Sequence, residues 1–217
     1  NQLEVNEHIN LLDIGCGLGG PARMLADEFN CDVHGIDISY EYIRTAKKLT
    51  ELLKLSEKIS FIQGDALNLP YATESFDVVW TQHVQMNISD NLKFYLEISR
   101  VLKKGGALVY FDVFKKNGDI EFPVPWADTS DISFLHTIKE MVSVLDRLGF
   151  KELIIKDQSL SSEIFLQKVI NNLKMNGLPK LGLNLLMGPE IIEKLTNLRN
   201  GILNGNIEFQ IGIYIKY

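Results

Sequence analysis

The sequence predicts an α/β fold in which helices cover both faces of a doubly wound, mostly parallel sheet that ends in an antiparallel C-terminal strand. From Ile9 to Gly118, short apolar runs alternate with longer helical patterns, which is typical of βαβ units. From position 207 to position 215, every second residue is isoleucine or phenylalanine, which indicates a half-exposed closing strand. With 217 residues, 46% of them hydrophobic, the chain fits one domain over residues 1–217.

Local signals set the expected elements of the first half in order. Pro21 suits the first turn of a helix because its missing N–H would be unpaired there, and Ser39 and Asp90 suit the caps of two later helices. Glycines at 105 and 106 favour a turn over Lys103–Gly106. We expect strands at Asn10–Ile14, Cys31–Asp37, Lys58–Gln63, Phe76–Thr81 and Ala107–Phe114, and helices at Pro21–Phe29, Ser39–Leu55 and Asp90–Leu102.

The second half is less regular. A proline-rich loop at residues 123–126 leads into a helical pattern near Phe134–Leu148 and a strand near Glu152–Asp157. Two further helical stretches, Ser162–Met175 and Pro189–Leu203, are expected before the closing strand.

Composition limits the classes of binding partner and the cellular compartments that we expect for this protein. A net charge of -6 and a pI near 5.3 argue against an extended nucleic-acid surface, which needs clustered Lys and Arg. The two cysteines, Cys16 and Cys31, give no disulfide framework, and no apolar run reaches the ~20 residues that span a bilayer. The polar start, residues 1–10, lacks the regions of a signal peptide. We therefore expect a cytoplasmic protein with a small-molecule partner and no membrane contact, and a homodimer stays open.

A glycine cluster lies between the first expected strand and the next helix, where an open α/β sheet binds ligands. Gly15, Gly17 and Gly20 fit the spacing G-x-G-x-x-G of a dinucleotide site, although a plain tight turn is also open. Asp37 ends the second strand, where its carboxylate is placed to accept hydrogen bonds from both hydroxyls of an adenosine ribose. Capping the next helix is the other role for Asp37, but Ser39 already offers it. The two features together favour an adenosine-containing ligand.

Three further motifs decide which ligand of that kind to expect. The triplet Gly-Asp-Ala at 64–66 follows the third strand, where an acidic side chain suits an adenine amino group. Phe76–Trp80 forms the fourth strand, and Arg100–Leu108 leads into the fifth. With these four ordered motifs, residues 9–113 resemble the class I S-adenosylmethionine-dependent methyltransferases, which implies a Rossmann-like fold. Trp80–Ile88 and Pro123–Ala127 look more loosely like the small-molecule methyltransferases of type 11, which include sarcosine/dimethylglycine and tocopherol-type enzymes.

The resemblance implies S-adenosylmethionine as the methyl donor and a small molecule as the acceptor (EC 2.1.1). A carboxylate at Asp13, beside the glycine loop, would lie near the positively charged end of the cofactor. The cofactor contacts that we expect are Asp13, Gly15, Cys16, Gly17, Gly19, Asp37, Ile38, Gly64, Asp65, Ala66 and Gln82.

Methyl transfer from a sulfonium is an in-line displacement, so the protein mainly has to align the reactants and exclude water. An amine must be neutral to attack, whereas a phenol, a quinol or an acidic carbon benefits from a base. His83 is the candidate base, because it follows the fourth strand where the methyl group should emerge; packing on the cofactor is the alternative. Gln85, Asn87 and Trp126 are candidate acceptor contacts, with Trp126 acting either by cation–π attraction or as a core anchor. The spacing of His, Cys and carboxylates suggests no metal site.

Two alternatives stay open at this point. A nicotinamide (NAD)-dependent oxidoreductase would use the same glycines and Asp37, and a non-catalytic protein would bind S-adenosylmethionine without turnover. The first strand is expected almost at once, near Asn10. We therefore expect that the helical lid found upstream in similar methyltransferases is absent, and that this form turns over poorly beside a longer chain.

Overall fold

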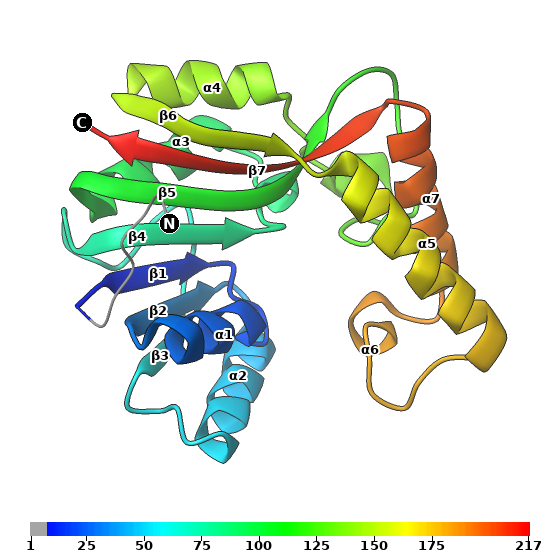
Figure 1. Ribbon diagram of the computed structural model, residues 1–217, viewed down its shortest axis with the longest axis horizontal. Coiled ribbons are helices and arrows are strands. Elements are labelled where there is room, and N and C mark those ends of the chain that lie inside the picture. Colours follow the sequence, from blue (N-terminus) through cyan, green and yellow to red (C-terminus); the bar gives the residue numbers. More distant parts are fainter. Residues whose placement is uncertain (1–7) are drawn as a thin grey trace.

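The structure is a computed structural model that describes residues 8–217, so the predictions made for residues 1–7 lie outside the described residues. A seven-stranded sheet with the order β3-β2-β1-β4-β5-β7-β6 forms the centre of this part of the chain (Figure 1). The first five strands run parallel, and β7 is antiparallel to both β5 and β6. The strands are β1 Asn10–Ile14, β2 Asp32–Asp37, β3 Ile59–Gln63, β4 Phe76–Gln82, β5 Leu102–Lys115, β6 Phe150–Asp157 and β7 Ile207–Lys216. The predicted mostly parallel sheet with an antiparallel C-terminal strand is confirmed.

The helices cover both faces, as predicted, and also form a separate layer at one end of the sheet. α5 and α7 lie side by side beyond the carboxyl ends of the parallel strands (Figure 1). The helices are α1 Gly20–Phe29, α2 Tyr40–Leu52, α3 Asn91–Val101, α4 Ile138–Arg147, α5 Ser159–Asn176, α6 Asn184–Met187 and α7 Ile191–Leu203, with 3-10 turns η1 Gln85–Asn87 and η2 Ser130–Ile132. None of the helices in residues 8–217 is long and apolar enough to cross a membrane.

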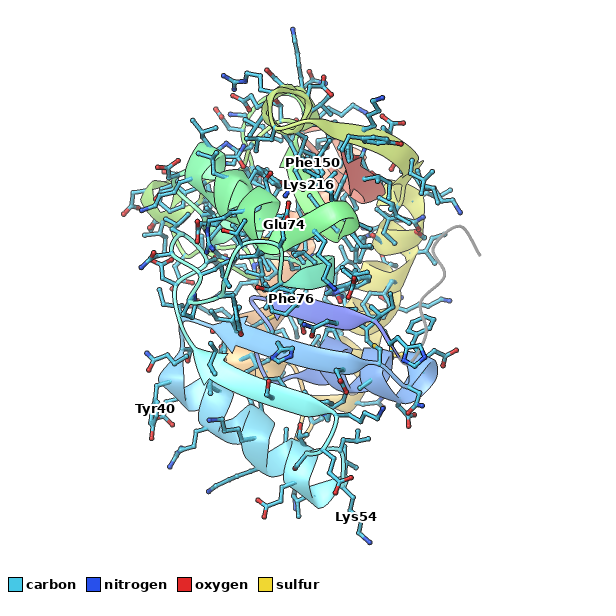
Figure 2. All side chains as sticks on the ribbon, turned by 90° about the vertical axis from the view of Figure 1, so that its left-hand side faces the viewer. Tyr40, Lys54, Glu74, Phe76, Phe150 and Lys216 are labelled. Carbon is cyan, nitrogen blue, oxygen red and sulfur yellow. The ribbon has the colours of Figure 1, made fainter. Side chains whose placement is uncertain are left out.

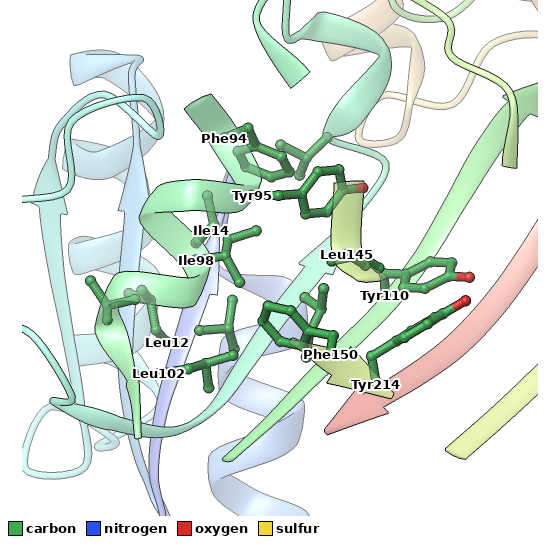
Figure 3. Packing of buried hydrophobic residues seen from close by; sticks show 14 of the residues in the cluster. Leu12, Ile14, Phe94, Tyr95, Ile98, Leu102, Tyr110, Leu145, Phe150 and Tyr214 are labelled. Carbon is green, nitrogen blue, oxygen red and sulfur yellow. The ribbon is translucent and has the colours of Figure 1, made fainter. Parts of the chain in front are cut away.

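Alternate side chains of the central strands divide the core into two layers. On β1, Leu11 packs with α1 and α2 on one face, whereas Leu12 and Ile14 pack with α3 and α4 on the other. Figure 3 shows the second layer, in which Phe94 and Ile98 of α3 lie among the strand residues. A third cluster joins α5 and α7 to the ends of β5 and β7. This arrangement leaves the carboxyl ends of β1, β2 and β4 facing the α5–α7 layer.

The C-terminal end of β7 also makes side-chain contacts with neighbouring parts of the sheet. Lys216 of β7 donates to the backbone oxygen of Leu102 at 2.7 Å and lies 3.9 Å from Glu74 (Figure 2). These contacts connect the C-terminal strand to the starts of β4 and β5. On the outer surface, Tyr40 at the start of α2 and Lys54 beyond its end point away from the sheet (Figure 2).

Two of the predicted boundaries are wrong for identifiable reasons. The expected turn at Lys103–Gly106 lies inside β5, where the pairing with β4 shifts register and Gly105 has a φ of +77°. A bulge thus takes the place of the turn. α4 begins at Ile138, four residues later than predicted, because Thr137 and Glu140 form a capping box at that point. The short helix α6 was not predicted.

Candidate active site

A cavity of about 1090 Å³ opens at the carboxyl ends of the parallel strands, between the sheet and the α5–α7 layer. Its walls come from the loops after β1, β2, β3 and β4, from the ends of β5 and β7, and from α5, α6 and α7. A single ligand site usually measures about 300–1000 Å³, so this cavity is as large as the largest of such sites. Its position at the ends of the strands is the one that open α/β sheets use for binding.

The Asp37 carboxylate joins two loops of the cavity wall. One oxygen, Oδ2, accepts a hydrogen bond from the Gly17 amide at 2.9 Å, and the other, Oδ1, accepts one from the Ser39 amide at 2.9 Å. Ser39 in turn caps α2 by accepting from the Tyr42 amide. The ligand and capping roles considered for Asp37 are therefore compatible: the carboxylate orders the start of α2, and it still lines the cavity with unused lone pairs.

Different structural constraints favour glycine at the three positions 15, 17 and 19 of the loop after β1. Gly17 has a φ of +53°, and a Cβ built on it would meet nothing within 4 Å, so its backbone is open to the cavity. A Cβ on Gly15 would instead lie 2.5 Å from the Val84 side chain, and one on Gly19 would lie 2.5 Å from the Phe61 ring. Gly15 lines the cavity with its backbone, whereas Gly19 does not reach the wall.

The loops after β2 and β3 provide the next part of the wall. Ile38, Gly64, Asp65 and Ala66, which are predicted cofactor contacts, all line the cavity. The Gly64 amide donates to the backbone oxygen of Asp37 at 3.0 Å, and Asp65 accepts from the Leu67 amide at 2.8 Å. These bonds hold the third loop against the second and present an exposed carboxylate beside a small side chain.

Asp13 and Cys16 lie behind the wall rather than on it. The Asp13 side chain is 1% exposed, and it accepts from the Ala22 amide at the start of α1, while its Oδ2 has no hydrogen-bond partner. Burial, reinforced by the neighbouring Asp37 carboxylate, raises the pKa of Asp13 to about 8. Burial likewise raises the pKa of the Cys16 thiol, which packs in the core layer under α1. Both residues therefore support the loop and do not reach the cavity.

His83 lies on the cavity wall just after β4, next to Gln82 and close to Asn87, which line it too. It has a φ of +56°, a conformation that is strained for a residue with a side chain and that is often found at functional sites. The His83 ring is open to the cavity but lies between aromatic side chains. The ring centroids of Phe111 and Phe209 are 4.8 and 6.0 Å from the centroid of the His83 ring. These apolar surroundings lower the pKa of His83 to about 4, so the imidazole is neutral at physiological pH.

Gln85, an expected acceptor contact, does not line the cavity. It is 1% exposed, donates to the backbone oxygen of Val113 at 3.0 Å and accepts from the Tyr95 hydroxyl at 3.4 Å. Asn87, two residues further along the same 3-10 turn η1, is exposed and lines the cavity. Its role is to anchor the segment that carries His83.

Asp112 is a site residue that the sequence analysis missed. Its buried carboxylate accepts from the amides of Val84 and Gln85 at 3.3 and 3.4 Å, and burial raises its pKa to about 7. It thereby fixes the start of η1 directly after His83. A single Asp inside the apolar run of β5 was the available signal.

Trp126 lines the cavity from the loop after β5, as expected. Its indole Nε1–H donates to the Ser133 hydroxyl at 2.9 Å, which holds the ring in place. Within residues 8–217, no group of three or more His, Cys, Asp or Glu side chains is arranged to hold a metal ion.

Residues 12–110 match the protein family described as "Methyltransferase domain". Over this segment, which is just under half of the 217 residues, the chain is similar to that family. The matched segment runs from Leu12 in β1 to Tyr110 in β5 and thus includes the loops that carry Gly17, Asp37 and Asp65.

Known proteins that the chain resembles include norajmaline N-methyltransferase from Rauvolfia serpentina, which is 38% identical over 108 residues. That match covers 50% of this chain and 37% of the relative, and the chain spans at most half the length of the first curated relatives it matches. These relatives extend beyond the part that is compared.

Two solved structures establish the fold over nearly the whole chain. A protein from Galdieria sulphuraria assigned as a sarcosine dimethylglycine methyltransferase has a TM-score of 0.84 at 21% identity and covers 98% of this chain and 80% of that one. Geranyl diphosphate C-methyltransferase from Streptomyces coelicolor A3(2), in complex with Mg2+, geranyl diphosphate and S-adenosyl-L-homocysteine, has a TM-score of 0.78 at 17% identity, with 98% and 75% covered. The helical layer α5–α7 is therefore part of the Rossmann-like fold that the chain shares with these two structures.

The buried Asp13 carboxyl gives a pH-dependent prediction for the stability of the domain. In the unfolded chain this group has its ordinary pKa near 3.8, whereas in the folded protein the pKa is about 8. Between these values the folded state holds a proton that the unfolded state has released, so the contribution of Asp13 to stability falls as pH rises, by at most about 1.4 kcal/mol per pH unit. Asp13→Asn removes this dependence.

The measurement is urea unfolding of both proteins at pH 5, 6.5 and 8. The free energy of unfolding of Asp13→Asn, measured relative to that of the original protein, should increase as pH rises. Asp27→Asn, at an exposed position of α1, is the matched control and should show no pH-dependent difference. A constant difference between Asp13→Asn and the original protein over this range would contradict the assignment of a raised pKa.

Proposed function

We propose that the protein transfers a methyl group from S-adenosylmethionine to a small-molecule acceptor. The observation that carries this proposal is the meeting of Gly17, Asp37 and Asp65 in one wall of the cavity, each contributed by a different strand-end loop of a methyltransferase domain. The net charge of -6 favours a small molecule over a nucleic acid as the acceptor. The cytoplasmic location and the homodimer stay predictions.

The residues present fit S-adenosylmethionine. The open backbone at Gly17 is a cradle that a side chain would fill, and Asp37 has acceptor capacity for the two ribose hydroxyls. Asp65 and Ala66 provide an acceptor and free space for an adenine ring, and Ile38, which is 72% exposed, offers an apolar surface beside it. The bound donor supplies a methyl group already activated on a sulfonium.

The chain's own part in the reaction is alignment, exclusion of water and handling of the acceptor's proton. Phe111 and Phe209 form apolar walls beside the His83 ring, and Trp126 lines the same cavity. The neutral imidazole of His83 accepts a hydrogen bond from the N–H or O–H of an acceptor. Because its pKa is low, a proton that it takes up is released again to solvent. Gln82 and Asn87 offer further hydrogen bonds on the same wall.

The structure argues against the oxidoreductase alternative. In a dinucleotide site, the pyrophosphate binds at the N-terminus of the first helix, where free amides point at it. Here the Asp13 carboxyl already accepts a hydrogen bond from the Ala22 amide at the start of that helix. A diphosphate would compete with this acidic group for the same donors.

The cofactor assignment predicts that S-adenosylhomocysteine stabilises the protein and that NAD does not. At a ligand concentration of 100 Kd, a ligand that binds only the folded state adds about 2.7 kcal/mol, which for a domain of this size raises Tm by roughly 5–10 °C. Asp37→Asn should show a smaller shift because it weakens the acceptor for the ribose hydroxyls, whereas the exposed Asp27→Asn should keep the full shift. The measurement is differential scanning fluorimetry, and a shift with NAD alone would overturn the assignment.

The proposed role of His83 predicts a loss of turnover without a loss of cofactor binding. His83→Gln keeps a hydrogen-bonding side chain but cannot take up a proton, so kcat should fall by about 100-fold or more. The Kd for S-adenosylhomocysteine should stay within about twofold. Steady-state transfer from labelled S-adenosylmethionine to an identified acceptor measures the first quantity and calorimetry the second. Retention of kcat would show that His83 only packs against the reactants.

A further inference from the structure

The cavity has two ends of different chemistry. The end at the loops after β1, β2 and β3 contains the backbone of Gly17 and the carboxylates of Asp37 and Asp65. Beyond His83, the walls come from β5, β7, α5 and α7 and are mainly aromatic and aliphatic. The residues that define this second end, called here the apolar end, are Phe111, Val113, Phe165, Leu166, Leu198 and Phe209.

We infer that the methyl acceptor is a predominantly apolar molecule that binds in uncharged form, with its polar group at His83 and its apolar body in the apolar end. The inference rests on the proposed function, because it needs the other end of the cavity to be taken by the methyl donor. The cavity of about 1090 Å³ continues from the strand-end loops to the apolar residues of β5, β7, α5 and α7, where such a body can bind.

The charges around the cavity exclude an anionic acceptor. Among the described residues that line the cavity, the charged side chains are Asp37 and Asp65, both in the end assigned to the donor. The cations on α7 beside the apolar end are already paired: Lys194 with Asp128 at 2.7 Å and Arg199 with Glu163 at 2.6 Å. A carboxylate or phosphate on the acceptor would therefore lose its hydration with no cation to replace it.

A cationic acceptor is disfavoured for a different reason. The sulfonium of the bound donor is itself positive and must lie within reach of the reacting atom, so a second positive charge there is repelled. His83 adds no compensating negative charge. The same field favours the neutral form of an amine, which is the form that attacks.

The polar groups of the wall fit an acceptor with a single polar end. His83, Gln82 and Asn87 are grouped where the two ends of the cavity meet. The hydroxyls of Ser161 and Ser162 in α5 also line the cavity, and the single proton of the Ser161 hydroxyl is shared between the backbone and side-chain oxygens of Gln158, at 3.0 and 2.7 Å. The body of the acceptor thus meets mainly apolar surface.

The test uses the protein saturated with S-adenosylhomocysteine and a homologous series of 4-n-alkylphenols, from methyl to n-hexyl, with Kd measured by calorimetry. Each added CH2 group should tighten binding about three- to fourfold until the apolar end is filled. The 4-n-alkylbenzoates of the same chain length carry a carboxylate in place of the hydroxyl and should bind about tenfold or more weakly. A series without dependence on chain length, or benzoates that bind as well as the phenols, would overturn the inference.

A pair of variants shows whether binding takes place in the apolar end. Phe165 is 59% exposed and lines the cavity, whereas Leu160, on the same helix, is 74% exposed and does not line it. Phe165→Glu should weaken 4-n-pentylphenol binding at least about fivefold, and Leu160→Glu should leave it unchanged. Equal effects of the two variants would contradict the assigned position.

The S-adenosylhomocysteine shift in Tm separates this inference from the proposed function. It should be retained in both variants, which also shows that they are folded. A protein that binds S-adenosylhomocysteine but fails the alkylphenol series refutes the acceptor class alone. A protein that does not bind S-adenosylhomocysteine refutes the proposed function itself.

Discussion

The Asp37 carboxylate is the interaction on which the geometry of the donor end depends. Two parallel strands deliver their following loops to the same edge of the sheet, but they do not by themselves fix how those loops lie. The hydrogen bonds from the Gly17 and Ser39 amides to the two oxygens of Asp37 do so. Because hydrogen bonds to a charged group are stronger than neutral ones, one side chain sets the positions of the first loop and of the start of α2 together. The Gly64 amide, bonded to the backbone oxygen of Asp37, extends this order to the third loop.

A second buried carboxylate plays the corresponding part at the other side of β4. Asp112 holds the amides that directly follow His83, and Gln85 ties the same turn to β5 and Tyr95. The strained backbone of His83 is thereby fixed from behind, while its ring remains open to the cavity. The cavity thus has two rigid edges, and the apolar end formed by α5 and α7 closes the space between them.

The sequence predicted the parts of the molecule that depend on local signals. The strand-end loops, the closing antiparallel strand and the residues Gly17, Asp37 and Asp65 follow from motifs and periodicity. It could not separate residues that face the cavity from neighbours that face away, as with Gln85 and Asn87, because a 3-10 turn has no long period to read. It also missed Asp112 and the apolar lining from α5 and α7. Their positions are set by packing between segments that are far apart in the chain. The amphipathic pattern of a helix shows which face is apolar, but it does not identify the segment against which that face packs.

The central claim is that three strand-end loops together form the binding site for the methyl donor. Hydrogen–deuterium exchange with and without S-adenosylhomocysteine tests it most directly, because the claim names the amides that should become protected. We expect slower exchange in residues 15–19, 37–39 and 64–66, and no change in β6, Phe150–Asp157, at the opposite edge of the sheet. Binding that leaves all three loops unprotected, or that protects only the α5–α7 layer, would contradict the account.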